Sequence, residues 1–194
     1  AFGWRPMAAE ARLARAWAAL AAAGEHARGR GPSLDVARAL RGLSAAEPAA
    51  RETVATKLLL RLLNEPWTNL FAKQLLHLDA AGIENLCALH PGLLGCPDLG
   101  QRNAVRTWKN AVTKQVYEPA LVDIVEALLE ARADPSGRCH FGSTTPLISC
   151  AMAGWSAVTR LLLRSAADAT AADAARATAL HHAAAAHELA VVQL

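Results

Sequence analysis

Aromatic side chains are scarce in this sequence of 194 residues, at 5%, whereas 53% of the residues are apolar and alanine dominates among them. Alanine is the strongest helix former, and few stretches show the β-branched alternation that a half-buried strand needs. A chain of this length can bury a hydrophobic core of its own. We therefore expect an all-α protein.

Cysteines and long apolar runs are also few. The four cysteines are Cys87, Cys96, Cys139 and Cys150. They are too scattered for a disulfide framework in a chain that can build a core, so we expect reduced thiols and an intracellular, cytoplasmic location. No apolar run approaches the roughly 20 residues that span a bilayer, and we therefore expect no membrane contact.

A dense basic stripe is lacking as well. The net charge is only +3, and its excess of arginine lies in residues 1–50. A nucleic-acid-binding surface usually combines such a stripe with interleaved aromatic rings, so we expect no nucleic acid partner. The Ala- and Arg-rich start could instead be an organelle transit peptide, but Glu10, Glu25 and the lack of serines argue against that alternative.

Helix signals recur through the first half of the chain. Amphipathic spacing, capping residues and helix-ending glycines predict helices over 8–23, 33–40, 47–63, 67–78, 81–89 and 103–114. The Gly- and Pro-rich stretch 91–100 is the longest expected loop. We place a domain boundary there, between an N-terminal helical region at 1–100, of no family that we can name, and a second region at 101–194.

The last third of the chain repeats itself. Asp134 and Asp168 end two leucine-rich segments 34 residues apart, and Thr145 and Thr178 lie 33 residues apart. Periods of this length are typical of helix pairs that stack because none can bury its apolar face alone. Thr145 suits a helix N-cap, since Pro146 follows it at the first helical position.

This pattern resembles the ankyrin repeat, whose units open with Thr-Pro-Leu-His, continue with a Val-Val-x-Leu-Leu second helix and close with Gly-Ala-Asp. The resemblance covers about residues 116–194 and implies a helix-turn-helix repeat stack, or α-solenoid, of about two and a half repeats. We expect a degenerate or capping first unit, with helices near 112–118 and 122–131. A complete second unit follows, and the third breaks off at Leu194.

Several positions depart from the ankyrin pattern. Arg132 and Ala166 stand where the chain normally turns through a left-handed glycine, and a side chain in that conformation costs about 1 kcal/mol. Arg176 replaces the glycine of the hairpin before the third unit, which we expect to be less regular than the hairpin around Gly142. One extra residue near Ser143 shifts the register of the second unit's hairpin.

The resemblance implies that a protein partner binds at the hairpin tips and the exposed side of the first helices. Carried over to the second unit, it designates Arg138, His140, Phe141, Ser143, Thr144, Met152, Ala153 and Trp155. Phe141 and Trp155 are the foremost candidates, because aromatic rings supply much of the energy at interfaces. Alternatively, Trp155 folds back on the neighbouring unit. The third unit offers mostly alanines there, which give little specificity.

The late histidines do not form a recognisable metal or catalytic motif. His187 and Glu188 lack the second histidine of a His-Glu-x-x-His motif, because Val191 stands in its place. His181 occupies the histidine position of the ankyrin pattern. The resemblance implies that it braces neighbouring units through hydrogen bonds.

Other constellations also point away from chemistry. Cys87, His90 and Cys96 supply only one approximate pair of ligands, whereas a structural zinc site needs four in short paired spacings. No nucleotide-binding glycine loop, nucleophile elbow or paired-carboxylate motif occurs. We therefore expect no metal, no cofactor and no enzymatic activity.

These observations predict a monomeric scaffold or adaptor that binds another protein through its ankyrin-type surface. The chain starts at Ala1 and stops within an apolar helical pattern, so we expect it to be a piece of a longer protein. One alternative is a regulatory or substrate-recruiting fragment of a larger enzyme or channel. Another is a continuous α-solenoid whose N-terminal helices are decayed repeats, which would pack in register across residues 91–100.

Overall fold

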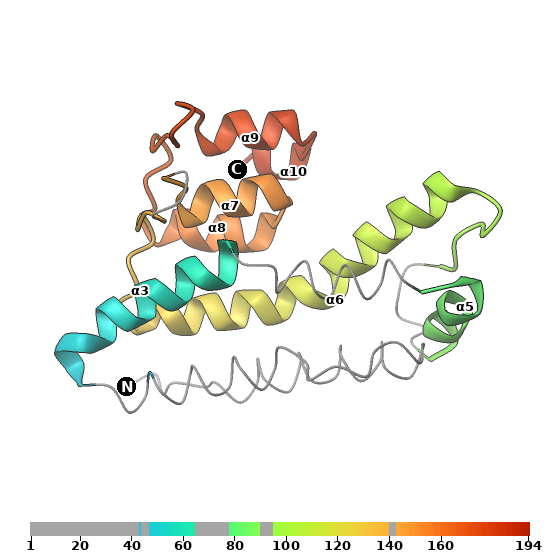
Figure 1. Ribbon diagram of the computed structural model, residues 1–194, viewed down its shortest axis with the longest axis horizontal. Helices are drawn as coiled ribbons and strands as arrows, with labels where there is room; N and C mark the ends of the chain where they lie inside the picture. Colours follow the sequence, from blue (N-terminus) through green and yellow to red (C-terminus); the bar gives the residue numbers. More distant parts are fainter. Residues whose placement is uncertain (1–42, 44–46, 65–77, 90–94, 140–142) are drawn as a thin grey trace.

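The computed structural model consists of helices joined by turns and hairpins (Figure 1), and it describes residues 43, 47–64, 78–89, 95–139 and 143–194. These ranges contain an isolated β-bridge between Ala172 and Thr178 but no strand. None of their helices is both long and apolar enough to cross a membrane. The helices predicted at 8–23, 33–40 and 67–78 lie outside the described residues.

Two helices of the N-terminal half confirm the sequence predictions. They are α3 (Pro48–Asn64) and α5 (Ala80–Leu89), predicted at 47–63 and 81–89. On α3, Ala55, Leu59 and Leu62 follow the spacing of one helical face and are all buried. α3 is therefore an amphipathic helix that is packed along one side.

The prediction of separate helices at 103–114, 112–118 and 122–131 is wrong. The whole segment forms one helix of 29 residues, α6 (Arg102–Glu130), which runs through Pro119. A proline removes one hydrogen bond and usually kinks a helix, but α6 contains no glycine that would favour the left-handed residue of a helix-ending turn. Buried positions from Val112 to Leu128 continue on both sides of Pro119, and they favour a continuous helix.

The two following units are helix pairs, as the sequence predicts. The second comprises α7 (Pro146–Ala153) and α8 (Ser156–Arg164), and the third α9 (Ala179–Ala185) and α10 (Leu189–Val192). The Thr145 hydroxyl accepts a hydrogen bond from the Ile148 N–H at 3.3 Å, and Pro146 occupies the first turn. Gly154 ends α7 in a left-handed conformation at φ 70°.

The helices stack in two layers. α7 packs against α9 and α6 packs against α8, while α3 packs against both α6 and α7. Figure 1 shows α3 antiparallel to the C-terminal half of α6, beneath α7 and α8. α3 thus takes the place that the first helix of the first unit, expected at 112–118, would have occupied.

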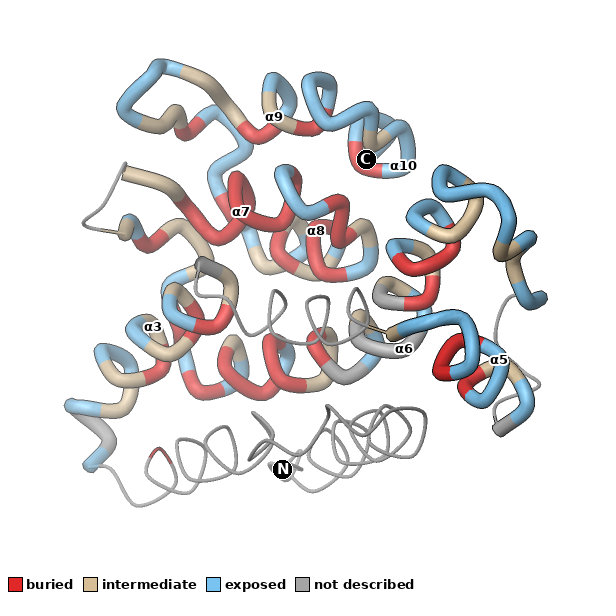
Figure 2. The backbone as a smooth tube through the Cα atoms, turned by 45° about the vertical axis from the view of Figure 1, so that its right-hand side comes forward, coloured by how far each residue is buried: buried red, intermediate tan, exposed pale blue. Residues whose placement is uncertain are grey.

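α3 and the repeats share one hydrophobic core. The largest fully buried side chains come from α3, from the repeats and from Leu43 upstream of α3, and they are Leu43, Leu59, Leu121, Ile124, Leu128, Ile148 and Leu162. Figure 2 shows the buried positions lining the facing sides of α3, α6, α7 and α8. The packing therefore crosses the boundary that we placed at residues 91–100, although the division into 1–100 and 101–194 stays a prediction.

A repeated polar contact joins α3 to this stack. The Thr56 hydroxyl accepts a hydrogen bond from the Asp134 N–H at 2.8 Å. One unit later, the Ser136 hydroxyl accepts one from the Asp168 N–H at 2.9 Å. Because Asp134 and Asp168 are equivalent in the repeat, α3 contacts the second unit as the second unit contacts the third.

Replacing Leu59 by alanine should destabilise the repeats as well as α3. The side chain is fully buried in the shared core, and such truncations cost about 2–5 kcal/mol. Urea unfolding followed by circular dichroism measures the change, with the exposed Lys57→Ala on the same helix as a control that should shift stability by less than about 0.5 kcal/mol. Unchanged unfolding of the repeats in Leu59→Ala would show that α3 is not part of their stack.

Candidate partner-binding surface

The hairpin before α7 is tied to the next hairpin by an arginine. The Cys139 N–H donates to the Thr144 carbonyl at 2.9 Å across the hairpin. Arg138 is exposed, and its Nη1 donates to the Ala172 carbonyl of the third unit at 2.9 Å. Arg138, designated as a contact residue by the sequence, therefore also holds two hairpins at a fixed spacing.

The hairpin before α9 is organised by one carboxylate. Asp173 Oδ1 accepts hydrogen bonds from the N–H groups of Ala175 at 2.8 Å and Ala177 at 2.9 Å. Its Oδ2 lies 2.7 Å from Nε2 of His182. The Ala177 hydrogen bond first, and then the His182 contact, lower the pKa of Asp173 below its ordinary value. Arg176, in place of glycine, adopts φ 63° in this hairpin.

The designated residues of the second unit do not all reach solvent. Met152 is 53% exposed, and Ala153 and Arg138 are exposed too. Ser143 and Thr144 are half-buried in the hairpin. His140 and Phe141 lie outside the described residues.

Trp155 belongs to the core rather than to the surface. It is only 5% exposed, so the ring follows the alternative in which it folds back on the stack. Burial of a large aromatic ring is favourable, and Trp155 directly follows the turn at Gly154, where neighbouring units meet. The expectation that Trp155 is accessible to a partner is therefore not met.

His181 acts within its own unit. Its Nδ1 accepts a hydrogen bond from the Thr178 N–H at 3.3 Å and lies 2.8 Å from the Thr178 hydroxyl. The two residues form a reciprocal capping box at the start of α9. These bonds lie within the third unit, so they do not brace neighbouring units as the resemblance implied. His182, to which the sequence gave no role, instead links α9 to the hairpin through Asp173.

On the opposite edge, carboxylates tie the units at their turns. A tryptophan side chain cannot accept a hydrogen bond, so Trp155 at the N-cap cannot satisfy the first N–H groups of α8. Glu118 of α6 does so, accepting from the Ala157 N–H at 2.6 Å, and the positive end of the helix dipole favours this carboxylate. Lys114 of α6 pairs with Glu188 at the start of α10 at 2.7 Å.

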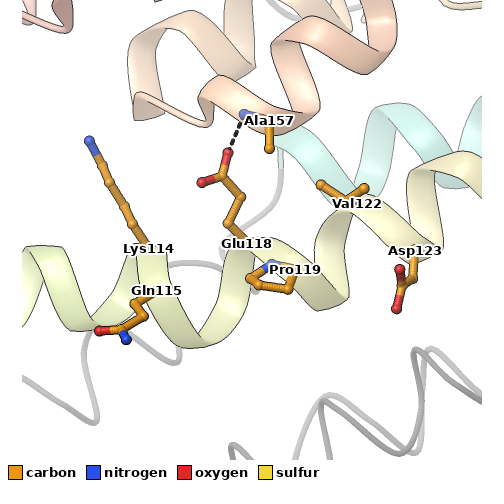
Figure 3. Close-up of a pocket in the computed structure, with 7 residues that line it drawn as sticks. All are labelled: Lys114, Gln115, Glu118, Pro119, Val122, Asp123 and Ala157. Carbon is orange, nitrogen blue, oxygen red and sulfur yellow. Dashed lines mark hydrogen bonds between the residues drawn. The ribbon is translucent and has the colours of Figure 1, made fainter. Parts of the chain in front are cut away.

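A groove of about 540 Å³ lies between α6 and α8 beside these contacts (Figure 3). It is lined by Lys114, Gln115, Glu118, Pro119, Val122, Asp123 and Ala157. Sequence reasoning missed it because the predicted helix ended at residue 118, whereas α6 continues past Pro119. Neither in the groove nor anywhere else in the described ranges do three histidine, cysteine, aspartate or glutamate side chains gather closely enough to hold a metal ion.

Helix pairs stacked in register, with hairpins on one edge, define a helical repeat protein. A family comparison agrees, since residues 115–194 match the model of ankyrin repeats in three copies. This C-terminal part of the chain is therefore composed of ankyrin repeats, a family of mostly non-catalytic modules that generally bind proteins. The search of curated proteins found no match.

The left-handed positions predicted from the repeat are confirmed. Arg132 and Ala166 have φ values of 67° and 61°, and His187, at the place of Gly154 one unit later, has φ 57°. Gly154 itself meets a second constraint. A Cβ on it would collide with the carboxylate of Glu188.

Gly154→Ala and Ala166→Gly should therefore change stability in opposite directions. Alanine at Gly154 adds a left-handed side chain, at about 1 kcal/mol, and displaces Glu188 from its place near Lys114. Glycine at Ala166 relieves the same conformation and should be neutral or stabilising by up to about 1 kcal/mol. Thermal unfolding of both variants provides the comparison. Equal destabilisation by both would refute this account of the turns.

Asp173→Asn should weaken the third unit in a pH-dependent way. Because the pKa of Asp173 is lowered in the folded protein, its stabilising effect is complete above the ordinary value of 3.8 and is lost as the pH falls below it. The difference in urea midpoint between wild type and variant should be largest near pH ~6 and shrink below pH ~4. A difference that is constant with pH would assign the effect to hydrogen-bond geometry alone.

Proposed function

We propose that the repeats bind a protein partner through the hairpin before α7 and the exposed C-terminal end of that helix. The surface comprises Arg138, Met152 and Ala153, with His140 and Phe141 assigned to it by sequence alone. It continues over the exposed Ala185 and Ala186 of the third unit. This binding requires no cofactor and no catalytic group.

The exposure of Met152 carries the proposal. From Pro146 to Ala151 every residue of α7 is buried, and Met152 then presents more than half of its side chain to solvent. Methionine adapts its shape to apolar surfaces and is frequent in protein-binding sites. Small alanines next to it in the same layer leave room for a partner's side chain to lie against the thioether.

Rigidity of the neighbouring hairpins supports the same surface. Arg138 fixes the distance between the second and third hairpins, and Asp173 fixes the conformation of the third. A surface that is already ordered loses less conformational entropy when a partner binds. Burial of Trp155 contributes to this order, since a core ring stiffens the turn next to Met152.

Capture of partners from a native lysate tests the proposal, with wild type, Met152→Glu and Arg160→Ala run in parallel. Arg160 is exposed on α8, in the other layer, and serves as the control. A partner held by wild type and Arg160→Ala should be weakened about tenfold or more by Met152→Glu, because a carboxylate is then desolvated at the contact. Circular dichroism verifies equal helicity. Equal capture by all three proteins would place the binding face elsewhere.

A further inference from the structure

The groove between α6 and α8 combines an apolar wall with one fixed carboxylate. Pro119, Val122 and Ala157 supply the apolar part, in which Pro119 and Ala157 are exposed and Val122 is half-buried. The volume of about 540 Å³ lies within the roughly 300–1,000 Å³ that is typical of ligand sites. The groove is therefore large enough to receive several side chains of a partner.

The carboxylate belongs to Glu118, which is held in one orientation. Its Oε1 accepts the Ala157 N–H at 2.6 Å in the first turn of α8, and Figure 3 shows the side chain rising from α6 toward α8. Within the part of the chain that the structure describes, no hydrogen bond or ion pair engages the second oxygen, Oε2. The carboxylate is thus fixed in place while one of its oxygens is available to a ligand.

The negative charge of Glu118 is not cancelled by its contacts, because a backbone N–H carries no net charge. Lys114 also lines the groove, but both Glu188 oxygens lie 2.7 Å from its Nζ, so another carboxylate balances its charge. Burial first, and then the charge of Glu118, raise the pKa of the Cys150 thiol. The charge of Glu118 therefore acts on its surroundings, and it favours a cation in the groove.

The shape of the groove suits an extended chain. Lys114, Glu118 and Val122 are spaced about one helical turn apart, so they follow one side of α6 for about 12 Å. An extended peptide rises about 3.3 Å per residue, and a segment of about four residues therefore matches this length. Phosphate-bearing surfaces, such as nucleic acids and anionic membranes, have the wrong sign of charge for Glu118.

We propose that this groove binds a short extended segment of a second protein, in which a lysine or arginine neighbours an aliphatic residue or a proline. The cationic group donates a hydrogen bond to Oε2 of Glu118, and its apolar neighbour lies on Pro119 and Val122. The groove shares no residue with the surface around Met152. One partner can therefore occupy each of them at the same time.

The fixed position of Glu118 favours this contact. A charge-assisted hydrogen bond between a cation and a carboxylate is stronger than a neutral one, but side-chain ordering and solvent usually offset much of its gain at a surface. Glu118 is already ordered by Ala157, so a ligand that binds to it loses less conformational entropy. Loss of the charge should accordingly weaken binding by about three- to tenfold.

A subtractive selection tests the proposal on the full chain. A random library of short peptides is first depleted on Ala157→Tyr and then selected on wild type. Tyrosine at this exposed position fills the groove and keeps the backbone N–H that bonds to Glu118, so depletion removes peptides that bind any other surface. The remaining binders should contain lysine or arginine next to valine, leucine, isoleucine or proline. No enrichment, or enriched peptides without a basic residue, would overturn the proposal.

Glu118→Gln is the second variant, because glutamine keeps an oxygen for the Ala157 N–H but carries no charge. The selected peptides should bind to it about three- to tenfold more weakly in fluorescence anisotropy. Glu130→Gln removes the same charge from the exposed last residue of α6, about 18 Å further along the helix, and should bind as wild type. Circular dichroism verifies that all variants are folded. Equal binding by Glu118→Gln and wild type, or an equal loss in Glu130→Gln, would contradict the assigned role of Glu118.

Discussion

Burial of apolar faces between successive helix pairs is the constraint on which this structure depends. Leu147 is 3% exposed because the third unit covers it, whereas Leu180, at the same place one unit later, is 57% exposed. Each leucine lies two residues after an N-cap threonine, so the difference comes mainly from the neighbouring unit. A helix pair of this kind gains most of its stability from the next pair, and only a little from its own two helices.

At the other end of the stack, the apolar face of the continuous α6 also needs a neighbouring helix to cover it. A continuous helix cannot fold back on itself to cover Leu121, Ile124 and Leu128, and these side chains are nevertheless almost fully buried. α3 supplies the missing layer with Leu59 and Leu62. The ankyrin repeats and the upstream helix therefore stabilise each other. Between them along the chain, the hydrogen bond from Lys109 Nζ to the Leu78 carbonyl joins α6 to the residues just before α5.

Local signals in the sequence were sufficient for the regular units. Thr145, Pro146 and Gly154 each act through their own backbone preferences, and the repeat period located Arg132 and Ala166 in left-handed turns. The role of α3 could not be read in this way, because its apolar face indicates only that something covers it. The same holds for the buried Trp155 and for the groove beside Glu118, which both arise from contacts between units distant in the chain.

Polar bonds at the two edges explain how the units keep a fixed shape although three of their turns place a non-glycine residue in the left-handed conformation. The left-handed backbone conformation at Arg132, Ala166 and His187 destabilises each of these turns by about 1 kcal/mol. Glu118 and the Lys114–Glu188 pair oppose this at the turn edge, and Arg138 and Asp173 do so at the hairpin edge. Because the bonds of Glu118, Lys114 and Arg138 cross from one unit to another, the strain in any one turn is resisted by its neighbours. The exposed end of α7 thus lies on a stack held at both edges, as a preorganised binding surface requires.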